Sequence, residues 1–178
     1  MASAIGASLL MMVAALPKTR TNSDDERRQL SQSAGALAGW REALTDAVDA
    51  DTAAYDEVVA AYRMAKSTDA DKADRRTAVQ RALQHATDVP LKVMELSSSV
   101  LDAARIVAAH GHRGAASDVG VAIALVEAGM TGARLNVDIN LGGIEDAEYK
   151  ARVASDVERF SLRGAAALAD ARRSLAPA

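Results

Sequence analysis

Apolar residues recur at every seventh position between residues 30 and 62, in two interleaved sets. The first set is Leu30, Leu37, Leu44, Asp51 and Val58. The second set is Ala34, Arg41, Val48, Tyr55 and Tyr62. On a helix the two sets form one stripe that faces a core or a partner. The pattern predicts a long amphipathic helix in which Asp51 stands in an apolar seam, where Leu or Val is expected.

Asp51 is the first candidate for chemistry, because burying an unpaired carboxylate costs roughly several kcal/mol. A buried Asp51 must therefore be paired, protonated or used. Pairing gives a structural ion pair across the seam, with Arg41 or with a neighbouring helix. Use indicates proton transfer, because a low-dielectric seam favours the protonated carboxyl and adapts it to catalysis. The spacing alone leaves both interpretations open.

Capping residues and apolar spacing predict five helices joined by short connections. Their expected ranges are about 2–16, 24–65, 68–109, 118–141 and 145–175. Ser23 and Glu26 have the spacing of a capping box before the second helix, and Ser117 is the expected cap of the fourth. Pro90 is expected to kink the third helix, and Pro177 follows the fifth.

The composition agrees with a single all-α domain covering residues 1–178. Hydrophobic residues make up 49% of the chain but aromatic residues only 3%, so the apolar mass is Ala, Val and Leu, which suits close-packed helices. The second and third helices would each be roughly 60 Å long at about 1.5 Å per residue. A chain of this size can hardly cover such helices on every face, which favours an elongated bundle that dimerises side by side.

Charge and residue counts exclude several classes of protein. The net charge of −3 speaks against a nucleic-acid partner. The absence of cysteine excludes disulfides and thiolate catalysis, and His85, His110 and His112 lack metal-ligand spacing, so no metal site is expected. The apolar first sixteen residues are too short to span a bilayer and lack the basic region of a secretory signal. We expect a buried core helix there, no membrane partner and a cytoplasmic protein.

One face of the fourth predicted helix is small at one end and bears amides at the other. It carries Gly129, Gly132, Asn136 and Asn140. Small residues allow a flat ligand or another helix to approach closely, and two amides can donate and accept in the plane of a heterocycle edge. A ligand site and tight helix packing with satisfied asparagines both remain open.

Charged residues at helix ends form a weaker group of candidates. Arg63 and Lys66 end the second helix and Asp118 begins the fourth, positions that the helix dipole favours for these charges. Solvated end charges are the simpler interpretation of all three from their spacing.

Five segments carry a resemblance to a known family. They are AVDADTAAY (47–55), AYRMAK (61–66), ATDVPL (86–91), SDVGVA (117–122) and LNVDINL (135–141). In order and spacing they resemble the cyclodeaminase/cyclohydrolase family of folate enzymes, over about residues 2–150. Formiminotetrahydrofolate cyclodeaminase and a stand-alone methenyltetrahydrofolate cyclohydrolase belong to this family. The resemblance implies an all-helical homodimer that handles 5,10-methenyltetrahydrofolate, with this tetrahydrofolate derivative as substrate and no bound cofactor.

The resemblance also implies roles for individual residues. The family's catalytic acid is the second acid of an Asp-x-Asp-x-x-x-aromatic motif, which here is Asp51. The candidates for binding the substrate within the matching segments are Tyr55, Asp118, Asn136 and Asn140. The candidates for binding the anionic glutamate tail of folate are Arg63, Lys66 and Arg113.

Three functions stay open at this point. Both reactions of the family pass through a tetrahedral carbon between two nitrogens and need proton transfer at nitrogen, which a carboxylate can perform. Formiminotetrahydrofolate cyclodeaminase, which releases ammonia as the ring closes, is the first expectation, with a formiminotransferase as candidate partner. Methenyltetrahydrofolate cyclohydrolase, in which water opens the ring, is the alternative. Because the chain starts without the family's Pro-Gly-Gly-Gly-Ser-like turn, an inactive helical interaction module is the third.

Overall fold

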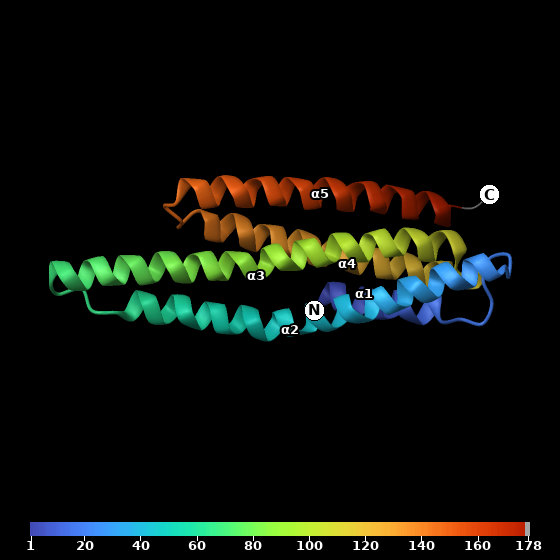
Figure 1. The fold of residues 1–178 in the computed structure, drawn as a ribbon, viewed down its shortest axis with the longest axis horizontal. Coiled ribbons are helices and arrows are strands. Elements are labelled where there is room, and N and C mark those ends of the chain that lie inside the picture. Colours follow the sequence, from blue (N-terminus) through green and yellow to red (C-terminus); the bar gives the residue numbers. More distant parts are fainter. Residues whose placement is uncertain (177–178) are drawn as a thin grey trace.

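A computed structural model describes residues 1–176 of the chain, and Pro177 lies outside them. Within the described residues there are five α-helices and no strand (Figure 1). The helices are α1 (Ala2–Ala14), α2 (Asp24–Arg63), α3 (Asp69–His110), α4 (Ala116–Leu141) and α5 (Ala147–Leu175), with a short 3₁₀ turn at Arg113–Ala115. The prediction of an all-helical chain with five helices is confirmed, with bounds that agree to within a few residues.

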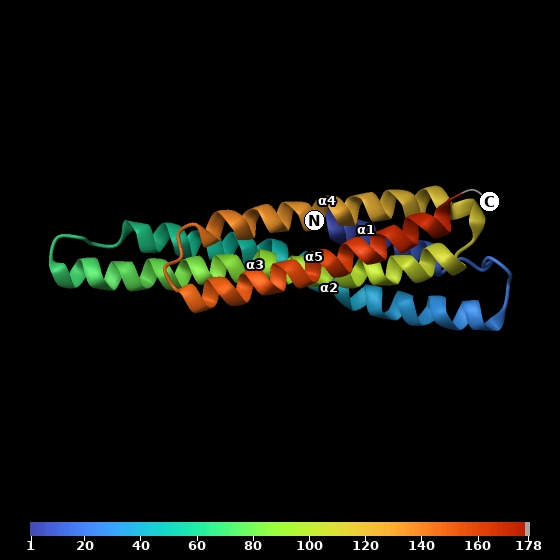
Figure 2. The same cartoon turned by 90° about the horizontal axis from the view of Figure 1, so that it is seen from above.

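The helices lie nearly parallel to one long axis, with α3 in the middle of the bundle (Figures 1 and 2). α3 packs against each of the other four helices, while α1 packs between α2 and α4. α2 and α3 have 40 and 42 residues and form an antiparallel hairpin, and its turn extends beyond all the other helices (Figure 1). α1 has only 13 residues and starts near the middle of the long axis, so it covers one half of α2 and leaves the other half uncovered.

Two groups of buried apolar residues form the core. The larger group lies where all five helices meet and includes Leu10, Leu37, Val107 and Val126. The smaller group lies towards the α2–α3 turn, where Val79 and Met94 of α3 pack against Tyr149 and Phe160 of α5.

By length and apolar composition alone, the segment Arg113–Leu141 is the one stretch of residues 1–176 that could cross a membrane, and here it packs on α1 and α3.

The helix ends correct the two predicted caps and show a further cap at the start of α5. The Ser23 side chain accepts from the Glu26 backbone N–H, but the Glu26 carboxylate accepts from Thr19 and Thr21, so the predicted capping box is only half formed. Ser117 is not the cap of α4, because this helix continues from the 3₁₀ turn before it and begins at Ala116. α5 begins after Asp146, whose side chain accepts from the Tyr149 N–H.

Candidate active site

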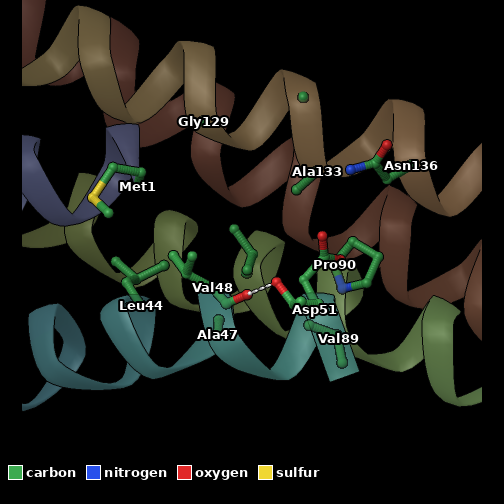
Figure 3. Close-up of a pocket in the computed structure, with 13 residues that line it drawn as sticks. Met1, Leu44, Ala47, Val48, Asp51, Val89, Pro90, Gly129, Ala133 and Asn136 are labelled. Carbon is green, nitrogen blue, oxygen red and sulfur yellow. Dashed lines mark hydrogen bonds between the residues drawn. The ribbon is translucent and has the colours of Figure 1, made fainter. Parts of the chain in front are cut away.

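A groove opens between α2 and α4 beside the N-terminal start of α1 (Figure 3). Its volume is ≈ 330 Å³, α3 forms its floor, and Met1 closes one end. The α2 wall consists of Leu44, Ala47, Val48, Asp51 and Thr52. The floor consists of Val89, Pro90 and Val93, and the α4 wall of Gly129, Gly132, Ala133 and Asn136. Most of the residues that line the groove are apolar, and polar groups, including a carboxylate on one wall and an amide on the other, share its surface with them.

Asp51 is exposed in this groove, so the expectation that it lies in a buried seam is wrong. The apolar stripe of α2 is buried at Leu30, Leu37 and Leu44, where α1 and α3 cover it. Beyond Leu44 the covering helix is missing, because α1 starts at this level, so the stripe is exposed at Val48, Asp51 and Tyr55 and becomes partly buried again only at Val58. The predicted alternative of an ion pair with Arg41 is also absent, since Arg41 is exposed and the described residues give Asp51 no ion-pair partner. Asp51 is therefore a solvated carboxylate at the edge of the groove.

The face of α4 that carries glycines at one end and asparagines at the other borders the same groove as Asp51, except at Asn140. Gly129, Gly132 and Asn136 all line the groove. The two glycines differ in their surroundings: a Cβ at Gly129 would lie 2.2 Å from the Ser3 Oγ, whereas a Cβ at Gly132 meets nothing within 4 Å. Gly129 is therefore explained by close packing of α1 on α4. Gly132 leaves open space in the groove beside the exposed Asn136 side chain.

Asn140 does not line the groove and has a partner inside the protein. Its Nδ2 donates a 2.7 Å hydrogen bond to the backbone oxygen of Ala86 in α3. Pro90, four residues after Ala86, lies in the floor of the groove and is buried. α3 continues as one helix through Pro90.

The remaining site candidates lie away from the groove within one chain. Arg63 is the last residue of α2 and Lys66 lies in the turn to α3, at one end of the bundle (Figure 1). Arg113 and Asp118 lie at the opposite end, where α3 is followed by α4. Tyr55 lies one turn beyond Asp51 on α2 and is 65% exposed. A single chain thus brings Asp51 and Asn136 together but not the three cations.

A second cleft lies between α2 and α3, nearer to their turn. It measures ≈ 660 Å³ and is lined by Glu57, Arg81 and His85 among others, with His85 Nδ1 2.9 Å from a Glu57 oxygen. This cleft is larger than the groove, but its polar residues are already paired with each other or exposed to solvent. The groove is the better candidate, because two residues selected from the sequence on separate grounds face each other there.

Several residues that line the groove without a proposed chemical role could not be identified from the sequence. Met1, Val93 and Thr52 line it without any signal in the sequence. Pro90 did carry a signal, because a proline in the interior of a helix removes a backbone donor and marks an unusual place. It was interpreted as a kink rather than as part of a site.

Comparison with known proteins gives matches over most of the chain. A family model described as formiminotransferase-cyclodeaminase matches residues 1–159. The methenyltetrahydrofolate cyclohydrolase of Methylorubrum extorquens is 36% identical over 155 residues, which are 87% of this chain and 74% of that protein. The formimidoyltransferase-cyclodeaminase of Sus scrofa is 32% identical over 151 residues, which are 85% of this chain but only 28% of that protein.

A solved structure supports the fold over nearly the whole chain. The crystal structure of formiminotetrahydrofolate cyclodeaminase from Thermotoga maritima superposes with a TM-score of 0.85 and 23% sequence identity. The match covers 98% of this chain and 83% of the other. At this identity the likeness concerns the helical fold alone.

Proposed function

Because the chain belongs to the formiminotransferase-cyclodeaminase family of folate one-carbon enzymes, we propose that it acts at the one-carbon bridge of 5,10-methenyltetrahydrofolate. The observation that carries the proposal is the groove in which Asp51 on α2 faces Asn136 on α4, over a floor that contains Pro90 (Figure 3). The groove combines apolar side chains, against which a flat heterocycle can pack, with polar groups on both walls.

We favour hydrolysis of the methenyl bridge over ammonia release. The sequence alone puts cyclodeaminase first, but the relative named as a cyclohydrolase is matched over 74% of its own length, whereas the pig cyclodeaminase is matched over 28%. The name of that larger protein and the family description both include a cyclodeaminase activity. Cyclodeaminase therefore remains the second candidate, with a separate formiminotransferase as its partner.

Asp51 would serve as the acid and base of the reaction. Water attacks the methenyl carbon between the two nitrogens, and Asp51 accepts a proton from this water as the C–O bond forms. One C–N bond then breaks, its electron pair stays on nitrogen, and the protonated Asp51 donates a proton to that nitrogen. The second proton of the water leaves as the carbonyl of the formyl group forms. The positive charge of the substrate's amidinium attracts the carboxylate and favours its approach.

The α4 wall would hold the ring system. The amide of Asn136 can donate and accept hydrogen bonds at the edge of a pterin. Gly132 has no side chain, so the flat ring can lie against the α4 backbone. Binding would also displace water from Asp51, which strengthens its interaction with the cationic carbon.

We infer that two copies of the chain pair through α1 and α4. The exposed apolar side chains on these neighbouring helices are Met1, Ile5, Met12, Val121, Leu135 and Ile139. α1 has no charged residue, and in α4 Glu127 pairs with Arg172 while Arg134 lies near Asp138, so Asp118 in the first turn is the α4 charge without an ion pair among the described residues. A face with few charges and several exposed apolar side chains is typical of an interface with a second copy. Such a dimer could bring Arg63, Lys66 or Arg113 of the partner towards the folate tail.

The test is to incubate the purified protein with 5,10-methenyltetrahydrofolate and to follow the loss of its near-UV absorbance. A buffer-only reaction measures spontaneous hydrolysis, and the Asp51→Asn variant measures what the groove contributes. We expect a protein-dependent loss of absorbance that Asp51→Asn slows by about 10²–10⁴-fold. Formiminotetrahydrofolate is tested next: a rise of the same absorbance with release of ammonia would assign the second candidate instead. Binding of both folates without turnover would identify the third alternative, an inactive helical module.

A further inference from the structure

A proline in the middle of α3 leaves one backbone acceptor without its helical donor. In an α-helix the N–H of each residue donates to the carbonyl four residues earlier, and Pro90 has no N–H. The carbonyl that loses its partner is that of Ala86. An unpaired backbone carbonyl inside a packed bundle is costly, because it gives up water without gaining another donor. α3 nevertheless continues for twenty residues beyond Pro90, to His110.

The missing donor is supplied by the neighbouring helix. Nδ2 of Asn140 donates to the Ala86 oxygen over 2.7 Å. A carbonyl oxygen can only accept, so the amide nitrogen of Asn140 must face it and the orientation of the side chain is fixed. Asn140 lies one turn after Asn136 on α4, and Pro90 forms the floor beneath Asn136 (Figure 3). The hydrogen bond therefore ties the α4 wall of the groove to its floor.

The turn that follows α4 is also held on α3, but by side chains that reach out from α3. Gln80 donates to the Gly143 oxygen over 2.9 Å and accepts from the Glu145 N–H over 2.8 Å. These two bonds fix the turn after the helix. The Asn140 hydrogen bond differs from these two, because its donor lies on α4 itself and its acceptor is the Ala86 carbonyl, where the backbone hydrogen bonds of α3 are interrupted.

We propose that Asn140 is a positioning residue of the groove: its amide replaces the N–H that Pro90 lacks and holds the α4 wall, with Asn136, against the α3 floor. The pair explains why a proline is tolerated within a long central helix. It also distinguishes the two asparagines of this face, since Asn136 lines the groove and Asn140 bonds to the Ala86 carbonyl. The effect on substrate binding rests on the proposed function, whereas the effect on folding does not.

The first test is a double-mutant cycle of Asn140→Ala and Pro90→Ala, followed by thermal unfolding. Asn140→Ala leaves the Ala86 carbonyl unpaired and should lower the Tm by about 3–8 °C. In the Pro90→Ala background residue 90 regains its N–H, so the same substitution should cost less than half as much. Asn136→Ala is the matched control, because Asn136 has no bond to α3, and its effect on the Tm should be the same in both backgrounds. Equal losses for Asn140→Ala in both backgrounds would overturn the pairing. If Asn140→Ala alone does not fold, folding of the double variant supports the pairing and its failure overturns it.

The second test separates positioning from mere stability. Amide hydrogen exchange over residues 136–143 should be faster in Asn140→Ala and also in the double variant, because neither has the tie to α3, but unchanged in Pro90→Ala alone. For the same reason KM should rise about 3–10-fold in both variants that lack Asn140, with kcat retained, and Pro90→Ala should not restore it. Unchanged exchange in Asn140→Ala would overturn the positioning role. If the wild-type protein has no folate activity, the proposed function fails, and exchange together with the Tm cycle still decides this inference.

Discussion

Asp51 and Asn136 face each other across one groove, although they belong to helices that are far apart in the sequence (Figure 3). Asp51 comes from α2 and Asn136 from α4, and the buried Pro90 of α3 lies between them in the floor. The groove exists because α1 fills only half of the space between α2 and α4 and ends at Met1. The length of the shortest helix thus decides where the two polar groups become accessible.

Replacing Asp51 by Asn should remove catalysis and leave the fold intact. The amide has the same shape but cannot exchange a proton, and general acid–base groups contribute typically about 10²–10⁴-fold to a rate. We expect kcat to fall by that factor with folate binding largely retained. Because Asp51 is exposed and unpaired, the Tm should stay within about 1 °C of the wild type. Asp56→Asn, an exposed acid on another face of α2, is the control and should retain full activity. Full activity of Asp51→Asn would rule out the mechanism.

Asn136→Leu should weaken folate binding without unfolding the chain. The substitution removes the amide on the α4 wall, and leaving a ligand's polar edge unpaired typically costs about 1–3 kcal/mol. We expect KM or Kd to rise about tenfold, with a Tm near that of the wild type because Asn136 is exposed. Thr131→Val, on the same helix but outside the groove, should change neither value. Unchanged binding by Asn136→Leu would mean that this wall is only structural.

Two glycines of α4 should respond to alanine in opposite directions. Gly132→Ala places a methyl group in open space and improves helix propensity by about 1 kcal/mol, so the Tm should rise by about 2–4 °C. Gly129→Ala places the methyl group 2.2 Å from Ser3 Oγ and 3.0 Å from Ser3 N, which forces α1 away from α4. Overpacking of this kind costs about 1–3 kcal/mol, so the Tm should fall. Thermal unfolding of both variants tests this prediction. A higher Tm for Gly129→Ala than for the wild type would contradict the close packing of α1 on α4 at Gly129.

The stability of the chain should fall below pH 4.5 through Glu26. This carboxylate is only 6% exposed, and a 2.5 Å hydrogen bond from Thr19 Oγ1, aided by the Thr21 N–H, lowers its pKa from 4.5 to about 2 against the opposing effect of burial. A folded-state pKa below the unfolded one stabilises the protein above pH 4.5, and the contribution is lost as the pH falls towards 2.

In Glu26→Gln the Tm should be lower near pH 6 and should depend less on pH between 4.5 and 2 than in the wild type. Glu145→Gln is a suitable control, because Glu145 is exposed and pairs with Arg76 at the surface. The same slope of Tm against pH in Glu26→Gln and wild type would contradict the assignment of this titration to Glu26.

A charge placed on the α1/α4 face should prevent dimerisation. Ile139 is 73% exposed in the single chain, so Ile139→Glu has no reason to unfold it. We expect light scattering to give twice 18.5 kDa for the wild type and 18.5 kDa for the variant. Leu162→Glu changes an equally prominent apolar residue on α5, which is 63% exposed, and should leave the mass of the dimer unchanged. A wild-type mass of 18.5 kDa at micromolar concentration would be decisive against pairing.

The helices could be predicted from the sequence because their signals are local. Ser23 does accept the backbone hydrogen bond expected at the start of α2. The heptad stripe of α2 was correct for Leu30, Leu37 and Leu44. It failed at Asp51 because the burial of a side chain on α2 depends on which helix packs against it. The spacing of apolar residues along α2 cannot predict where α1 begins.

The site could be predicted only in part for the same reason. Asp51, Gly132 and Asn136 were separate candidates from their spacing on two helices, and the structure places all three in the lining of one groove. Asn140 shares the face of Asn136, yet its partner is a carbonyl set free by Pro90 on another helix. Such a contact depends on the packing of α4 on α3, which no spacing within either helix specifies.

The turn of the α2–α3 hairpin extends past the ends of the other helices, and between Ala61 and Val79 no residue is buried. A two-helix tip of this kind can separate and re-form without opening either core cluster, because little apolar surface is exposed when it does so. The tip is therefore the part of the chain that a protease should cut first. Arg63 and Lys66 are carried on this least stable segment, so they can change position relative to Asp51 while the groove itself stays rigid.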